Sequence, residues 1–273
     1  MSASNEEIQA LADFLRGAKT VVITGAGVST DAGLPDYRGA GGTEDPSIDY
    51  DMFLSSPSWR RWVWQRNQET WQALDALTPP ASQQILADWE ERGLITGVAT
   101  QNVDGLHEKA GTKNLAQMHG TFRRVVCLDC QERFDREDID VLLRELNPDV
   151  NYDSNPAHAA ILASADRAAA GASTFKVAPC PKCQGVLKPD IVFFGEQVQD
   201  LDPAFEFARA ADKILVLGTS LVVLTGLWVM QEAWSRGAQL AIVNRGPTQA
   251  DGFAHLRLEG DVDDILTRVD QQL

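Results

Sequence analysis

Four short apolar segments place the main constraint on the fold. They are rich in β-branched residues, and each ends in small or polar residues: TVVIT at 20–24, LITGVAT at 94–100, KILVLGTS at 213–220 and QLAIVN at 239–244. Near-continuous apolar strands separated by helical stretches are typical of a parallel sheet covered by helices on both faces. We therefore predict an α/β fold with a Rossmann-like, doubly wound parallel sheet. Ligands of such sheets bind at the carboxyl ends of the strands.

The four cysteines form two C-x-x-C pairs and leave no cysteine over. The pairs are CLDC and CPKC, which contain Cys127, Cys130, Cys180 and Cys183. Each pair can present two thiolates from one turn, and two turns complete the tetrahedral set that structural zinc prefers. Because four thiolates fill the coordination shell, we predict one structural Zn²⁺ with no catalytic position and no cysteine nucleophile. Disulfides are the alternative, which a cytoplasmic chain disfavours.

Two segments interrupt the strand and helix pattern. Residues 40–93 begin with a loop rich in Gly, Asp and Pro and continue as helices that contain five of the seven tryptophans. Residues 121–192 contain all four cysteines. We predict a helical insertion at 40–93 and a smaller zinc-ribbon module at 121–192. The Rossmann-like domain then comprises residues 1–39, 94–120 and 193–273.

Charge and the first residues indicate the kind of partner and the location. The net charge of −15 opposes nonspecific binding to nucleic acid or to anionic membranes. No apolar run approaches the roughly 20 residues of a membrane-spanning helix. The first residues, MSASNEEIQALADFLRGAK, are acidic and amphipathic, unlike a secretory or organellar signal. We expect a cytoplasmic protein with no nucleic-acid or membrane partner, whose acidic surface either suits a lysine-bearing protein or only maintains solubility. The sequence predicts no oligomeric state.

The sequence GAGVSTDAGLPDYRG, which follows the first predicted strand, is typical of a loop that binds a dinucleotide. Gly25 and Gly27 allow a tight turn and the close approach of backbone N–H groups to a diphosphate. Thr30 stands where G-x-G-x-x-G has its third glycine. No clear acidic ribose ligand follows about 20 residues later in a second βαβ strand. Both departures disfavour a conventional dehydrogenase.

Polar residues follow the second predicted strand in TQNVDGLHEKAG and QMHG. Gln101, Asn102 and Asp104 offer amide and carboxylate groups suited to ribose hydroxyls and a carboxamide, at the edge where a doubly wound sheet binds its ligand. Two of the four histidines, His107 and His119, belong to this region. His119 is the better candidate for a base because it borders the zinc module, where two domains would form a cleft. A hydrogen-bonded structural histidine is the alternative for both.

Together these motifs resemble the sirtuins, which are NAD-dependent protein lysine deacylases. The motifs GAGVSTDAGLPDYRG, TQNVDGLH, HG at 119–120, the paired CxxC, KPDIVFFGE, GTSLVV and VNRGPT occur in the order of the family between residues 21 and 246. PDYRG, CLDC and LKPDIVFFGE are most similar to the class II branch. The resemblance implies NAD⁺ as co-substrate, one structural zinc ion and an acyl-lysine protein or peptide as substrate.

The resemblance also implies a mechanism without hydride transfer. The carbonyl oxygen of the acyl-lysine would attack C1′ of the nicotinamide ribose, so that nicotinamide leaves and an alkylimidate forms. His119 would be the general base that relays a proton from the ribose hydroxyls, and a reference pKa of about 6.5 suits that task. Asn102 would contact the ribose and help to place water. The products would be free lysine and O-acyl-ADP-ribose.

The cofactor contacts implied by the resemblance lie at the strand ends. Tyr37 would cover the nicotinamide region, and Arg38 would hold phosphate. The whole set consists of Gly25, Ala26, Gly27, Ser29, Thr30, Pro35, Asp36, Tyr37, Arg38, Gln101, Asn102, Asp104, Gly218, Thr219, Ser220, Asn244, Arg245, Gly246 and Val262.

The resemblance places the peptide substrate between two strands formed by IVFFGE and SLVVL, through β-strand addition. The candidate contacts are Val192, Phe193, Gly195 and Leu221. Relatives that prefer acidic acyl groups read the carboxylate with Tyr-x-x-Arg. In VWQR, Arg66 keeps the arginine and Val63 replaces the tyrosine. Arg66 can bind an acyl carboxylate or form an internal salt bridge, so acidic, branched and plain acetyl groups all stay open.

Two further functions compete with deacylation. One is mono-ADP-ribosyl transfer from the same cofactor to a protein side chain. The other is a non-enzymatic, NAD-sensing scaffold, which the joint presence of Asn102, Asp104 and His119 disfavours.

Overall fold

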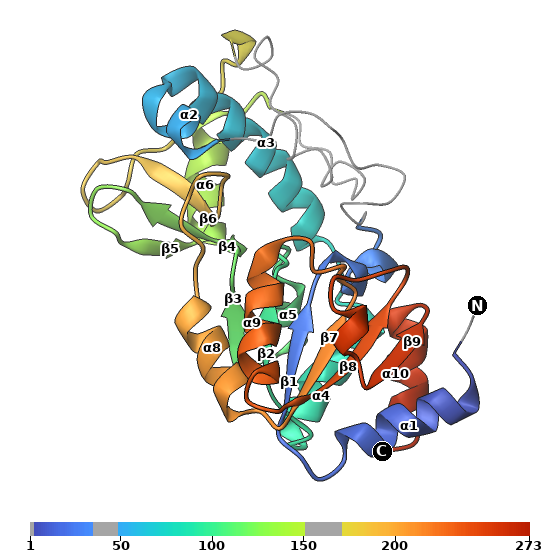
Figure 1. Ribbon diagram of the computed structural model, residues 1–273. Coiled ribbons are helices and arrows are strands. Elements are labelled where there is room, and N and C mark those ends of the chain that lie inside the picture. The colour runs from blue at the N-terminus through green and yellow to red at the C-terminus, as the bar shows by residue number, and fades with distance from the viewer. Residues whose placement is uncertain (1–2, 35–48, 151–170) are drawn as a thin grey trace.

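The computed structural model describes residues 3–34, 49–150 and 171–273 (Figure 1). The predicted cofactor residues Pro35, Asp36, Tyr37 and Arg38 lie outside these ranges. A six-stranded sheet and a three-stranded sheet form the centres of two lobes of the molecule. Among the described residues, no helix is long and apolar enough to cross a membrane.

The six-stranded sheet is entirely parallel, as the sequence predicts. Its spatial order is β3-β2-β1-β7-β8-β9. The strands are β1 (Thr20–Thr24), β2 (Ile95–Thr100), β3 (Leu115–Gln117), β7 (Lys213–Leu217), β8 (Gln239–Asn244) and β9 (Leu256–Glu259). The four strongly apolar segments are the adjacent strands β2, β1, β7 and β8. From β1 the chain continues to β2 and β3 on one side of the sheet, and from β7 it continues to β8 and β9 on the other side. A topological switch point therefore lies between β1 and β7.

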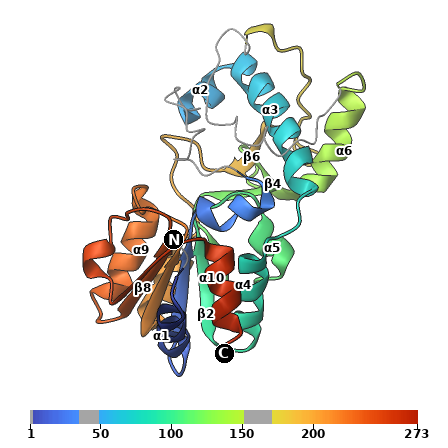
Figure 2. The ribbon, with the colours of Figure 1, turned by 90° about the vertical axis from the view of Figure 1, so that its right-hand side faces the viewer.

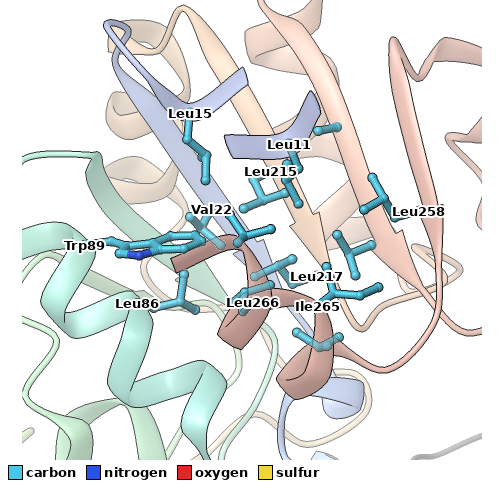
Figure 3. Close-up of a cluster of buried hydrophobic side chains, with 14 of the residues drawn as sticks. Leu11, Leu15, Val22, Leu86, Trp89, Leu215, Leu217, Leu258, Ile265 and Leu266 are labelled. Carbon is cyan, nitrogen blue, oxygen red and sulfur yellow. The ribbon is translucent and has the colours of Figure 1, made fainter. Parts of the chain in front are cut away.

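Helices cover both faces of this sheet (Figure 2). One face carries α1 (Asn5–Leu15), α4 (Ala81–Glu91) and α10 (Val262–Asp270), and the other carries α8 (Leu201–Ala210) and α9 (Leu224–Trp234). Figure 3 shows the first of these cores, where Leu11 of α1, Trp89 of α4 and Ile265 of α10 surround Val22 and Leu215 of the strands. The predicted doubly wound α/β fold is therefore confirmed.

The smaller sheet forms the centre of the second lobe, which we call the small module. Its antiparallel order is β5-β4-β6, with β4 (Gly120–Cys127), β5 (Arg133–Asp135) and β6 (Leu187–Ile191). A separate core joins this sheet to α2 (Tyr50–Ser55), α3 (Pro57–Asp75) and α6 (Arg136–Leu146). Trp64 of α3 is fully buried, and its indole N–H donates to the carbonyl of Leu187 at 3.0 Å.

Residues 40–93 were expected as one helical insertion, and the described part of this segment, 49–93, divides between the two lobes. The α3 side chains pack in the core of the small module, whereas α4 packs against the large sheet and α10. Trp89 of α4 is fully buried, and its indole N–H donates to Asp270 at 2.8 Å. This packing favours a domain boundary before α4. Phe193, at the other expected boundary, packs in the core of the small module.

Candidate active site and metal centre

The loops after β1 and β7 meet backbone to backbone at the switch point. The N–H of Gly27 donates to the carbonyl of Gly218 at 2.8 Å. A Cβ on Gly25 would lie 2.6 Å from Cβ of Thr219, and one on Gly27 would lie 2.6 Å from Cα of Gly218. Only glycine therefore fits at either position, and Gly218 has a φ of +59° as well. The Thr30 hydroxyl donates to the carbonyl of Gly27 at 3.1 Å, so this residue holds the same loop.

This loop contains the short helices η1 (Ala26–Val28) and η2 (Thr30–Ala32), and Ser29 between them is buried. The Ser29 hydroxyl donates to Asp104 at 2.7 Å and accepts from the side-chain amides of Asn102 at 3.1 Å and Gln83 at 3.2 Å. Asn102 also donates to the carbonyl of Gly25 at 3.1 Å. The structure thus brings the predicted loop residues together. Gln83, on α4, has no motif in the sequence and was missed.

Asp104 offers a carboxylate at the same strand-end edge. One carboxylate oxygen accepts from Ser29, and the other accepts from the backbone N–H of Leu106 at 2.9 Å. Burial raises the pKa of Asp104, and these two hydrogen bonds oppose the rise.

His119 immediately precedes β4, where the two lobes meet. Its Nδ1 lies 2.8 Å from the carbonyl oxygen of Gln101, and its Nε2 lies 3.0 Å from the hydroxyl of Thr225. A carbonyl oxygen can only accept, so Nδ1 carries the proton and the lone pair is on Nε2. Burial lowers the pKa of His119, and the hydrogen bond to Gln101 opposes the fall. The ring is therefore neutral at pH 7 and has a basic nitrogen, as a general base requires.

His107 has a different environment. It is buried, and its Nε2 lies 3.0 Å from the hydroxyl of Thr24. Thr24 in turn donates to Thr100 at 2.8 Å, and Thr100 accepts from the backbone N–H of Asn102 at 3.0 Å. Burial lowers the pKa of His107 to about 4. Of the two candidate histidines, the geometry therefore favours His119 as the base and gives His107 a structural place in the core.

The residues predicted for the adenosine end lie after β8. The Asn244 side chain donates to the carbonyls of Arg245 and Gly246 at 3.0 Å each, which closes a tight turn. Arg245 forms an ion pair with Asp261, and the N–H of Gly246 donates to Glu259 at 2.7 Å. Two further residues were predicted to contact the cofactor. The backbone carbonyl of Ser220 accepts from the N–H of Gln249 at 2.9 Å, and the side chain of Val262 is buried in the core of the large sheet.

The four cysteine sulfurs converge in the small module. All lie within 4.8 Å of one another, with 3.5 Å between Cys127 and Cys183 and 3.8 Å between Cys130 and Cys180. Four thiolates at about 2.3 Å from one zinc ion would be about 3.8 Å apart in tetrahedral geometry. The sulfur set therefore fits Zn²⁺.

The two cysteine turns share one backbone design. The residue after each second cysteine has positive φ, +58° at Gln131 and +63° at Gln184. Its N–H donates to the carbonyl of the first cysteine, at 3.0 Å in one turn and 2.9 Å in the other. The N–H of Leu128 donates to the carbonyl of Val186 at 2.8 Å, which joins the turns. The backbone thus holds the four sulfurs in place.

Comparison with known proteins places this architecture in one family. The Sir2 family model matches residues 25–225, which is more than half of the chain. The chain belongs to the sirtuin family. This sirtuin is 36% identical over 276 residues to NAD-dependent protein deacetylase 1 of Mycobacterium avium (strain 104), a match that covers 100% of this chain and 98% of the relative. It is 34% identical to the human NAD-dependent protein lipoamidase sirtuin-4, mitochondrial, over 97% of this chain and 86% of the relative.

Solved sirtuins have the same fold. One structure from a study of the structural basis of sirtuin substrate affinity superposes with a TM-score of 0.76 and 31% identity, over 97% of this chain and 98% of the other. A second, Sir2 with a p53 peptide and NAD⁺, superposes with a TM-score of 0.72 and 30% identity over the same fractions.

Two segments of this sirtuin are predicted to pair with a peptide: IVFFGE contains the last residue of β6 and an isolated bridge between Phe194 and Asp49, and SLVVL leads into α9. β6 ends at Ile191, and the chain turns at Gly195, which has a φ of +81°. The N–H of Val192 donates to the carbonyl of His119 at 2.8 Å. Phe193 is buried in the small module, and Leu221 is fully buried with a φ of +58°. The side chains of Phe193 and Leu221 thus lie in the two cores, and their contact with a peptide stays a prediction.

Arg66 lies on α3 and forms an ion pair within the helix. Its guanidinium lies 2.8 Å from Glu69, and each side chain is about one-quarter exposed, at 24% and 25%. Val63 is buried in the core of the small module. Of the two uses open to Arg66, this structure contains the internal salt bridge.

Proposed function

We propose that this sirtuin is an NAD-dependent protein lysine deacylase that transfers the acyl group from lysine to ADP-ribose and releases nicotinamide. The observation that carries the proposal is the position of His119, a neutral histidine with a basic Nε2 at the edge where the glycine loop, Asn102 and Asp104 converge. The names of the bacterial relatives, NAD-dependent protein deacetylases, support the same activity.

The strand-end loops suit a dinucleotide. Gly25 and Gly27 would hold its diphosphate with their backbone, beside Gly218 and Thr219. Asn102 and Asp104 would contact the nicotinamide ribose and the carboxamide. We keep Pro35, Asp36, Tyr37 and Arg38 in the proposed site on the resemblance of their motif. When bound, NAD⁺ supplies an electrophilic ribose carbon and the ribose hydroxyls that accept the acyl group.

His119 would hold and move the proton of this reaction. Nε2 would accept a proton from a ribose hydroxyl. The backbone carbonyl of Gln101, which accepts a hydrogen bond from Nδ1–H, would stabilise the imidazolium that forms. Asn102 is held by Ser29 and Gly25, so its amide keeps a fixed orientation in the proposed site.

The four thiolates would bind one zinc ion as a structural clamp of the small module. Thiols are kept reduced in the cytoplasm, so four cysteines that bind a metal rather than form disulfides support our proposal of a cytoplasmic location. The protein substrate would present its acyl-lysine beside His119, near the turn at Val192 and the loop before α9.

Product analysis tests the proposed activity. With NAD⁺ and an acetyl-lysine peptide, we expect mass spectrometry to detect equal amounts of free lysine peptide, nicotinamide and O-acetyl-ADP-ribose. A protein or peptide that gains the mass of ADP-ribose, without O-acetyl-ADP-ribose, would instead identify mono-ADP-ribosyl transfer.

We propose uncharged acyl groups as the preferred substrates, because Glu69 already neutralises Arg66. The lipoamidase name of the human relative concerns an uncharged acyl chain too. In a peptide panel we expect kcat/KM for acetyl or a longer neutral chain to exceed that for succinyl and glutaryl by about tenfold or more, since an acidic acyl group would lack a free partner charge. E69Q frees Arg66 and should raise relative turnover of the acidic peptides. Faster turnover of succinyl by the wild-type protein, lost in R66A, would contradict this proposal.

A further inference from the structure

Thr225 connects α9 to the candidate base. It is the second residue of α9 and is 4% exposed. Its hydroxyl lies 3.0 Å from Nε2 of His119 and 3.1 Å from the side-chain nitrogen of Gln101. The amide N–H of Gln101 can only donate, so Thr225 accepts from it. The single hydroxyl proton of Thr225 is thus available to the lone pair of His119.

The Gln101 side chain is itself fixed at its other end. Its carbonyl oxygen accepts from the hydroxyl of Thr219 at 2.8 Å. A Cβ on Gly226 would lie 3.1 Å from the amide carbon and oxygen of Gln101, so this glycine lets α9 approach the amide closely. A directed chain of hydrogen bonds therefore runs from Thr219 through Gln101 and Thr225 to His119.

We propose that Thr225 is a positioning residue for His119. Its hydroxyl donates a hydrogen bond to Nε2 while the ring is neutral, and accepts a hydrogen bond from Nε2–H once the ring is protonated. This inference rests on the proposed function, in which His119 is the base. A hydroxyl can play both parts because it has one proton and two lone pairs, one of which already accepts from Gln101. The bond to the imidazolium is charge-assisted and hence the stronger of the two. Thr225 therefore makes His119 more basic than an apolar residue would.

The charged groups on the segments that contact His119 are already engaged. Asp104, on the loop after β2, accepts from Ser29 and from the N–H of Leu106. Glu196, on the turn after β6, forms an ion pair with Lys188 at 2.9 Å. Asp190, on β6, pairs with Arg124 and Arg133. Among the described residues, the hydrogen bonds of His119 lead only to neutral groups.

Three variants test this role. T225V keeps the shape and removes the hydroxyl, and T225S restores the hydroxyl. T20V is the matched control, because the Thr20 hydroxyl is buried at the opposite end of β1 and has no hydrogen-bond partner among the described residues.

The first measurement is the pH titration of the imidazole ¹⁵N and ¹H signals in protein without NAD⁺, with His119 assigned from H119A. We expect T225V to shift the Nε2 signal and to lower the pKa of His119, because valine cannot accept the bond of the imidazolium. T225S and T20V should titrate as the wild type does. Superimposable His119 titrations of T225V and wild type would overturn the proposal.

The second measurement is steady-state deacylation. We expect T225V to lower kcat by about five- to tenfold, the size typical of one lost hydrogen bond, with KM for NAD⁺ and peptide within about twofold of wild type. T225S should recover most of kcat. Equal loss in T225S, or wild-type kcat in T225V, would overturn the proposal. If the wild type forms no O-acyl-ADP-ribose, the proposed function fails, and the titration of the cofactor-free protein still tests the contact.

Discussion

Replacement of His119 by alanine should lower kcat for deacylation by about 10²- to 10⁴-fold, the range typical of the loss of a general base. The side chain has no charged partner among the described residues, and its ring hydrogen bonds join only Gln101 and Thr225. The fold and the zinc content should therefore survive. The measurements are kcat from product formation, the affinity for NAD⁺ and the zinc content of the purified variant.

A second histidine offers the control for H119A. His255 accepts from the N–H of Leu240 at 3.1 Å, away from the strand-end loops, so H255A should retain wild-type kcat. The pH profile adds an independent check. The base acts when neutral and burial lowers the pKa of His119, so kcat/KM should fall only as the pH drops through a value below 6.5. An H119A variant with wild-type kcat would refute the assignment.

Replacement of Cys180 by serine should remove the zinc ion and destabilise the small module. Cys180 is fully buried among the core side chains of this module, and three thiolates cannot close the tetrahedral site. Because metal binding contributes directly to folding in such sites, we expect substoichiometric zinc and a fall in Tm of about 10 °C or more. Elemental analysis and thermal unfolding measure these changes, and a strong chelator should reproduce them in the wild type.

Lys182 offers a matched control within the same cysteine turn. It is exposed and forms an ion pair with Glu132, so K182A should keep the zinc and the Tm of the wild type. A C180S protein with one equivalent of zinc and an unchanged Tm would contradict the structural assignment of the site.

The sequence predicted the central sheet correctly because its strands are buried on both faces, which leaves a continuous apolar signal. It did not predict that residues 49–93 divide between the two lobes. Periodicity identifies α4 as a helix, but the helix packs against α10, about 180 residues later in the chain, and periodicity cannot reveal such a partner. The pairing of residues 191–196 and 220–224 with a substrate peptide stays a prediction, and Gly195 and Leu221 within these segments have positive φ.

In the candidate site too, the sequence indicated residues that lie in motifs but missed residues that only the fold brings close. Motifs indicated Asn102, which follows a predicted strand, and His119, which borders the predicted zinc module. Thr225 and Gln83 belong to no such motif, and only the folded chain brings their side chains to His119 and Ser29. Glu69, by contrast, stands three residues after Arg66, so their pairing on one helix was a local signal in the sequence.

The backbone contact between Gly27 and Gly218 also limits how this site can evolve. A methyl group on either residue would overlap the main chain of the other, so no second substitution at the partner can make room for the first. A substitution at Gly27, at Gly218 or at both residues together would therefore disrupt the loop. Changes in nucleotide affinity should therefore arise in the surrounding side chains, such as Gln83, which bear on the loop without filling that contact.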